Sequence, residues 1–92
     1  LTVATMELWA ARAAAGAERK TYRVASKVGA NIRNGRSTAA GIVGLLKKGD
    51  RWSGYPTPGG SVTIAGYGSS KIWICDETGR GVWSLLLEET KD

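Results

Sequence analysis

The sequence has 92 residues, a length that fits one domain with a small core. Thirteen Lys and Arg against eight Asp and Glu give a formal net charge of +5, which favours an anionic partner without choosing among them. The chain has no histidine and one cysteine, which excludes an intrachain disulfide, zinc-finger spacing and the usual imidazole base of a catalytic triad. No stretch approaches the roughly eighteen apolar residues that cross a bilayer. We therefore expect no membrane span, no metal site and no cofactor.

Residues 1–20 differ in composition from the rest of the chain. Thr5 is a plausible N-cap, and apolar residues then recur at three- and four-residue intervals, which predicts one face of a helix. Such a short helix is marginal alone in water, so Trp9 is expected to dock on another surface; a partly helical linker is the alternative. Leu1 is not an initiator Met, so we expect a fragment or a processed product. The predicted organisation is a helix or linker over residues 1–20 and a barrel over residues 21–92.

From Thr21 onward, short strand-like runs alternate with Gly-rich turns, the pattern of a small β sandwich or barrel. Asn34-Gly35 predicts a turn with positive φ, and Gly49 predicts a second sharp turn. Residues 56–60 contain two Pro and two Gly and are expected to form a loop. The fold class is predicted as mostly β, a small barrel with an N-terminal α-helix. Strands are expected near residues 22–26, 30–32, 42–46, 51–55, 62–64, 71–75 and 81–83, and residues 85–87 close the chain.

Three segments resemble, in the right order, the bacterial Src-homology-3-like (SH3b) family. Residues 30–38 (ANIRNGRST) are similar to its signature L-N-V-R-S-G-P-S-T, and residues 44–50 (GLLKKGD) to its next element, G-x-L-k-k-G-t/d. Residues 73–75 and 79–83 (WIC, GRGVW) resemble its closing hairpin, W-x-k-V and G-k-x-G-W-V. The resemblance covers about residues 21–89. It departs from the family at Arg36, where Pro is usual, and at residues 55–71, whose length implies an extended hairpin.

The resemblance implies a small SH3-like β-barrel that binds the cell wall and has no catalytic residues of its own. Such modules target an attached peptidoglycan hydrolase, including phage endolysins. The implied partner is peptidoglycan or an anionic wall polymer, and the implied location is extracellular or cell-wall associated. Asp76 and Glu77 are adjacent in a turn and offer no cleft of the kind a glycosidase needs. The alternative is a small barrel that binds nucleic acid or another protein, and a third is a barrel that docks on its own parent domain.

Aromatic and basic residues beside turns are the candidates for a binding surface. Trp73, Cys75 and Trp83 lie in apolar strands and are expected to be core. Tyr55 precedes a Pro and Tyr67 lies between two Gly, so both are expected at exposed loop ends. Basic residues of the 33–36 and 47–51 segments either form one positive face or stay scattered on a solvated surface. The predicted ligand-binding residues are Asn34, Arg36, Trp52, Tyr55 and Tyr67.

Overall fold

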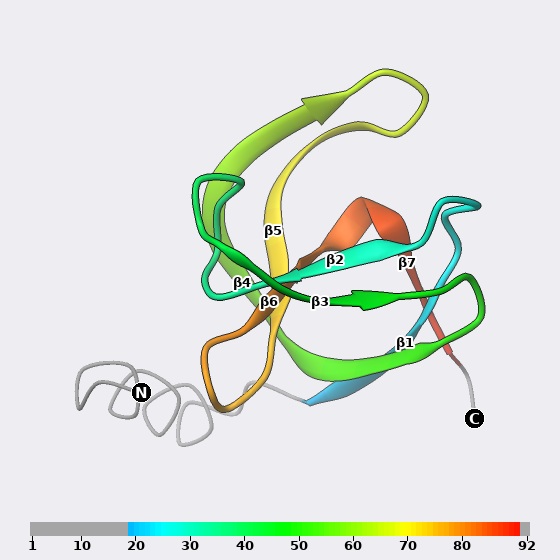
Figure 1. Ribbon diagram of the computed structural model, residues 1–92, viewed down its shortest axis with the longest axis horizontal. Helices are drawn as coiled ribbons and strands as arrows, with labels where there is room; N and C mark the ends of the chain where they lie inside the picture. The colour runs from blue at the N-terminus through cyan, green and yellow to red at the C-terminus, as the bar shows by residue number, and fades with distance from the viewer. Residues whose placement is uncertain (1–18, 91–92) are drawn as a thin grey trace.

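The computed structural model describes residues 19–90, which form one seven-stranded antiparallel sheet in the order β3-β2-β6-β5-β4-β1-β7 (Figure 1). This confirms the mostly β fold class. The predicted N-terminal helix falls on residues 1–18, outside the described residues, and the first strand begins at Lys20. The elements are β1 (Lys20–Val24), β2 (Ala30–Arg33), β3 (Ile42–Leu46), β4 (Arg51–Ile64), β5 (Gly68–Cys75), β6 (Gly81–Trp83), a 3-10 helix (Ser84–Leu86) and β7 (Leu87–Glu89).

The long strand β4 bends the sheet. Its first residues, up to Gly54, pair with β1, and from Tyr55 onward it pairs with β5. β4 and β5 together form the extended hairpin that the length of residues 55–71 implies. Figure 1 shows its distal half curving above β2 and the 3-10 helix. One strand therefore serves two parts of the sheet that face in different directions.

Residues 56–60 lie within β4, so the loop predicted there is wrong. Pro56 pairs with Ile74 and Pro58 with Ile72, and the pairing shifts by extra residues between Pro58 and Val62. Among residues 19–90, this half of β4 pairs only with β5, so it is a sheet edge, where a residue without an N–H is tolerated. The two Gly residues occupy the shifted segment, as is usual for a bulge.

The sheet is open, so the closed barrel predicted from the sequence is wrong. In residues 19–90, β3 pairs only with β2 and β7 only with β1, and no ladder joins the two ends of the sheet. The chain leaves β6 through the 3-10 helix, and the three residues of β7 then pair with β1. Both β3 and β7 consequently remain edge strands.

Apolar side chains are buried on both faces of the sheet. Successive residues of a strand point to opposite faces, so Val82 and Trp83 of β6 belong to different clusters. Val82 packs in a cluster with Val24 and Ala30, and Trp83 in a cluster with Trp73 and Cys75. Trp73, Trp83 and Cys75 are 1%, 3% and 0% exposed, which confirms that these three residues are core.

The turns only partly follow the sequence prediction. Gly49 has a φ of 90° and turns the chain between β3 and β4 as expected. Gly35 does not have a positive φ, and no described residue other than Gly does, so the tight turn predicted at Asn34-Gly35 is wrong. Residues 34–40 instead form a wide loop, closed by the Asn34 N–H, which donates to the Gly41 carbonyl at 2.8 Å.

Candidate binding groove

A groove of about 80 Å³ lies between β2 and the distal half of the β4–β5 hairpin. Its floor is aromatic, one wall is aliphatic, and the other wall carries polar side chains from β2 and from the 34–40 loop. A concave, mostly apolar surface with a few polar groups is the usual form of a ligand site. The lining residues are Asn31, Arg33, Thr38, Val62, Ile64, Trp73, Trp83 and Leu86.

The two tryptophans of the floor are held in place by their ring N–H groups. Nε1 of Trp73 donates to the Gly60 carbonyl at 2.9 Å, and Nε1 of Trp83 donates to the Ser70 carbonyl at 3.0 Å. Both acceptors belong to the hairpin that curves over the rings. Each indole donor is already used and the rings are 1% and 3% exposed, so the floor offers a ligand no hydrogen bond and almost no ring surface.

The polar wall is organised by Arg33 at the end of β2. Its Nη1 donates to the carbonyls of Thr38 and Ala40, both at 3.0 Å, and so ties the end of β2 to the C-terminal part of the 34–40 loop. Arg33 is also the one charged residue among the described residues that line the groove. The groove therefore has a positive group at one wall and no carboxylate in its lining.

The loop is joined directly to the hairpin at Arg36. The Gly60 N–H donates to the Arg36 carbonyl at 2.7 Å, and Nη1 of Arg36 donates to the Pro58 carbonyl at 3.2 Å. A Cβ at Gly59 would lie 2.5 Å from the Arg36 carbonyl oxygen and 2.9 Å from Cδ1 of Trp73. Only a residue without a side chain allows the loop and the strand to approach this closely.

The β4–β5 hairpin is also hydrogen-bonded to the β1–β2 connection and to the 3-10 helix. The Tyr67 hydroxyl forms a 2.8 Å hydrogen bond with Oγ of Ser26, in the connection between β1 and β2. Ser70 and Ser84 share a 3.1 Å bond between their hydroxyls, which ties β5 to the 3-10 helix. Together with the bond from the Gly60 N–H to the Arg36 carbonyl, these contacts join the hairpin to the rest of the fold.

None of the five predicted ligand-binding residues lines this groove. Asn34 is exposed, and Arg36 joins the loop to the hairpin. Trp52 is partly buried beside the Val24 cluster, with Nε1 donating to the Ile74 carbonyl at 2.8 Å, and Tyr55 packs against the Trp73 cluster. Tyr67 lies at the hairpin tip and is 38% exposed. The five residues are therefore dispersed over the fold.

The alternation of polar and apolar residues at positions 31–33 could have indicated that Asn31 and Arg33 share a face. They alternate with Ile32, which packs against the Val24 cluster as expected, so both point to the opposite face of β2. What the sequence did not indicate is that this opposite face is covered by the hairpin. The aliphatic wall, Val62 and Ile64, is brought there by the bend in β4.

The sequence allowed two arrangements of the basic residues, one positive face or scattered charges, and the structure shows no single positive face. Arg33 pairs with Ile42, whereas Leu46, which precedes the Lys47-Lys48 turn, pairs with Ala30, so the two basic segments lie at opposite ends of β2 and β3. The 47–50 turn lies instead beside the β1–β2 connection, because the Gly49 N–H donates to the Val24 carbonyl at 2.9 Å.

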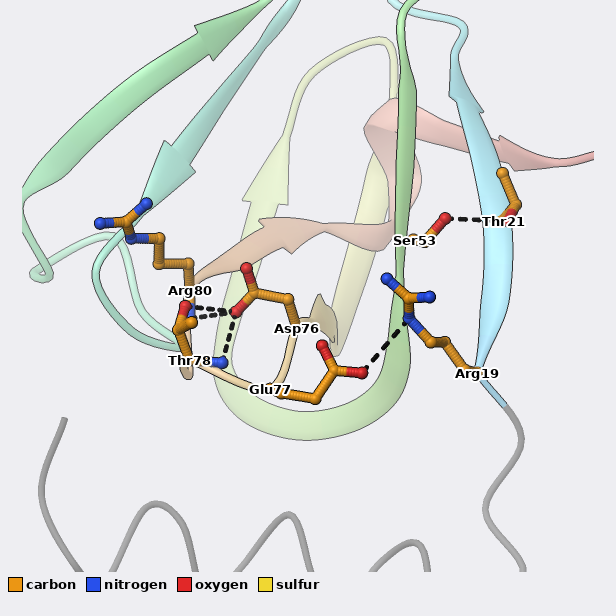
Figure 2. Close-up of polar contacts among 7 residues, drawn as sticks. All are labelled: Arg19, Thr21, Ser53, Asp76, Glu77, Thr78 and Arg80. Atoms are coloured by element: carbon orange, nitrogen blue, oxygen red, sulfur yellow. Dashed lines mark hydrogen bonds and ion pairs between the residues drawn. The ribbon is translucent and has the colours of Figure 1, made fainter.

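The carboxylates of the β5–β6 turn have structural roles (Figure 2). Oδ1 of Asp76 accepts hydrogen bonds from the Thr78 N–H, the Thr78 hydroxyl and the Arg80 N–H, and so holds the turn. Glu77 forms an ion pair with Arg19 at 3.3 Å. Within residues 19–90, no group of three or more His, Cys, Asp or Glu side chains is placed to hold a metal ion.

Comparisons with protein-family models, with curated proteins and with solved structures find no match to this chain. The resemblance to the SH3b family therefore stays a prediction from residues 30–38, 44–50 and 73–83. In the part of the chain that the structure describes, no helix is both long enough and apolar enough to cross a membrane.

Proposed function

We propose that this chain is a non-catalytic SH3b-like module that binds the bacterial cell wall, on behalf of an attached peptidoglycan hydrolase such as an endolysin. It would act outside the cell, at the wall itself. The observation that carries the proposal is the groove between β2 and the β4–β5 hairpin, whose hairpin wall is joined to the 34–40 loop, the β1–β2 connection and the 3-10 helix by hydrogen bonds. The resemblance to SH3b domains supplies the class of target.

The size of the groove favours an extended peptide with small side chains. A volume of about 80 Å³ holds only a few water molecules, which suits a stretch of backbone carrying Gly or Ala more than a sugar ring. The aliphatic wall of Val62 and Ile64 would cover the apolar side of such a peptide. The peptide part of peptidoglycan is a ligand of this kind.

The polar wall has groups that match a wall peptide. Asn31 carries an amide that can donate to and accept from a peptide backbone, and Arg33 carries a guanidinium suited to a carboxylate. Both lie on the same face of β2, two residues apart, beside the apolar floor. Each single contact of this sort is weak, and attachment to a repetitive wall would strengthen binding by effective concentration.

Binding to single-stranded nucleic acid is the less favoured alternative. That class of binder stacks bases on exposed aromatic rings along a basic groove. Here Trp73 and Trp83 are 1% and 3% exposed, and the groove lining carries one cationic residue among those described. The lysines of the 47–50 turn lie at the other end of β3 from Arg33.

A pair of neighbouring substitutions on the hairpin tests the groove. Ile64 lines the groove and Thr63 does not, although the two are adjacent in β4 and both are exposed. Ile64→Glu and Thr63→Glu change the net charge equally and place the new carboxylate on opposite faces of the strand; Thr63→Glu also removes the exposed 2.7 Å hydrogen bond between the Thr63 and Ser69 hydroxyls. Purified cell wall is incubated with each variant, and the protein that sediments with the wall is measured.

Ile64→Glu is expected to lower wall binding at least about tenfold, a loss of about 1.4 kcal/mol of binding free energy, and Thr63→Glu is expected to bind as the unchanged chain does. Equal loss in both variants would show that charge rather than the groove governs binding. Binding to an oligonucleotide that falls steeply with salt, together with no binding to wall, would favour the nucleic-acid alternative instead.

A further inference from the structure

Arg33 has a guanidinium group that is held in place and keeps one edge unused. Both of its hydrogen bonds to described residues start from Nη1, which donates to the Thr38 and Ala40 carbonyls. A guanidinium carries five N–H donors, so within residues 19–90 the donors of Nε and Nη2 are left for a ligand. The side chain is half-buried and lines the groove. Arg33 therefore offers the groove a preformed pair of donors.

The same edge of another arginine binds a carboxylate in this structure. Nε and Nη2 of Arg23 donate to Oε1 of Glu88 at 3.0 and 2.6 Å. A planar fork of two N–H groups matches a carboxylate, and such charged pairs are stronger than hydrogen bonds between neutral groups. Within residues 19–90, none of the five carboxylate side chains pairs with Arg33. Its fork is thus an open position for the carboxylate of a ligand.

The groove is short, and the hairpin is bonded to the rest of the fold beyond both of its ends. On β2 the lining spans residues 31–33, about 10 Å of extended backbone. Beyond one end the Gly60 N–H donates to the Arg36 carbonyl, and beyond the other the Tyr67 hydroxyl bonds Oγ of Ser26. A long chain lying in the groove would meet one of these contacts at each end. The groove therefore suits the end of a chain more than a chain that runs through it.

We propose that the groove binds the free carboxyl end of a peptide, with its carboxylate on Nε and Nη2 of Arg33. Small side chains next to that end lie against Val62 and Ile64, and the amide of Asn31 bonds the last peptide group. The source of the peptide rests on the proposed function. Hydrolysis adds water across a peptide bond and leaves a carboxylate and an amine, whereas a cross-linked peptide keeps an amide there. The groove thus distinguishes open peptide ends in the wall from cross-linked ones.

Three blocked tripeptides test the site on the full chain. The first is acetyl-Gly-Ala-Ala with a free carboxylate, and the second is its C-terminal amide. The third is acetyl-Gly-Glu-Ala amide, which carries the same charge on a side chain. Changes in backbone amide chemical shifts measure the three dissociation constants at fixed ionic strength. The free acid is expected to bind at least about tenfold tighter than either amide, because it alone has a carboxylate at the chain end.

Substitutions of Arg33 separate ligand binding from its role in holding the loop. In Arg33→Gln the free acid should lose its advantage, so the ratio of the amide to the acid dissociation constant falls to about one. Arg33→Lys keeps a charge without the fork and should retain part of the preference. Lys48→Gln removes the same charge at the other end of β3 and should leave the ratio unchanged. If both affinities fell together in Arg33→Gln and the ratio stayed, Arg33 would only hold the loop and the proposal would be overturned.

The wall itself separates this proposal from the proposed function. Carbodiimide coupling to an amine converts wall carboxylates into amides and leaves the phosphates of a wall polymer intact. The unchanged chain is expected to bind amidated wall at least about tenfold more weakly. Equal sedimentation with both walls would retain wall binding and overturn the carboxylate proposal. An acid preference without wall binding would overturn the proposed function alone.

The tripeptides alone also decide against the proposal if they fail to discriminate. Equal affinity for all three, or no binding of the free acid, would overturn it. A Glu-containing amide that binds as tightly as the free acid would show a carboxylate site without a preference for a chain end, and would overturn it as well. Each of these outcomes is read on the unchanged chain, so none depends on whether a variant folds.

Discussion

Gly59 is the position at which a single methyl group should separate the 34–40 loop from the hairpin. In Gly59→Ala the new Cβ would lie 2.5 Å from both the Arg36 carbonyl oxygen and the Arg36 Cβ. One of these atoms belongs to the backbone, so no rotation of a side chain can relieve the contact. The loop or the strand must move, and the bond from the Gly60 N–H to the Arg36 carbonyl stretches with it.

The expected cost follows from these two effects. Overpacking of a tight site costs about 1–3 kcal/mol, and a part-buried hydrogen bond that is lost adds about 1–3 kcal/mol. Replacing Gly by Ala also offsets about 0.4–1 kcal/mol of this loss, because it lowers the conformational entropy of the unfolded chain. Gly59→Ala should therefore lower the free energy of unfolding by about 1–5 kcal/mol, centred near about 3 kcal/mol, which corresponds to a fall in melting temperature of about 12–24 °C at the centre for a domain of this size.

The adjacent glycine provides the matched control. A Cβ at Gly60 would lie 3.4 Å from its nearest neighbours, which is ordinary van der Waals contact. Gly60→Ala should consequently melt within a few degrees of the unchanged chain, or slightly above it. Both variants are compared in urea, with tryptophan fluorescence as the probe. Equal stability in the two variants, or a larger loss in Gly60→Ala, would refute the close approach of Arg36 to Gly59.

Three further predictions concern the core, the hairpin tip and the pH dependence of stability. Trp73→Ala should cost about 3–5 kcal/mol of unfolding free energy, because the ring is 1% exposed; a loss below about 1 kcal/mol in a urea titration would contradict its burial. Tyr67→Phe removes the bond to Ser26 and should cost about 0.5–1.5 kcal/mol, with faster amide exchange at the hairpin tip as the local readout. The pKa of Tyr22 is raised above its ordinary 10.0, first by burial and then by the charge of Glu89. The folded state thus holds the phenol proton more tightly, and this stability is present below pH 10.0 and is lost as the pH rises through the folded pKa. Tyr22→Phe should flatten that part of the pH profile, and an unchanged decline at high pH would show that other groups cause it.

The elements that the sequence predicted well are those governed by local pattern. β3 was expected at residues 42–46 and begins and ends there, because four aliphatic residues and Gly44 are bounded by Gly41 and by the lysines of the next turn. Burial of Trp73 and Trp83 also followed from their place within apolar runs. In each case the composition of a few neighbouring residues was sufficient.

The strand through residues 56–60 was missed because distant residues determine it. Two Pro and two Gly in five residues are typical of a loop, and nothing nearby opposes that interpretation. The segment is held extended by its pairing with β5, by Nε1 of Trp73 on the Gly60 carbonyl and by the Arg36 carbonyl on the Gly60 N–H. All three contacts come from residues more than ten positions away in the sequence.

The candidate site was missed for a related reason. Tyr55, beside Pro56, was expected to be exposed at a loop end, yet it packs against the Trp73 cluster, and Trp52, also among the predicted ligand-binding residues, packs against the Val24 cluster. The groove is built from Asn31, Arg33 and the aliphatic wall, whose side chains meet only once β4 bends and the hairpin curves over β2. No spacing of residues in the sequence indicates the bend in β4.

The cluster of Trp73, Cys75 and Trp83 belongs to the core, and two of its members also form the floor of the groove. Nε1 of Trp73 bonds β5 to β4 within the hairpin, and Nε1 of Trp83 bonds β6 to the hairpin, so the same bonds that place the two rings in the core also fix the hairpin beside the groove. A site already held in its binding geometry loses little conformational entropy when a ligand arrives. Loosening the hairpin should therefore weaken binding by more than a loss of contacts would. Tyr67→Phe tests this separation, because Tyr67 lies outside the groove lining: a drop in wall affinity from a variant that stays folded would show that the anchored hairpin, and not the lining alone, sets the strength of binding.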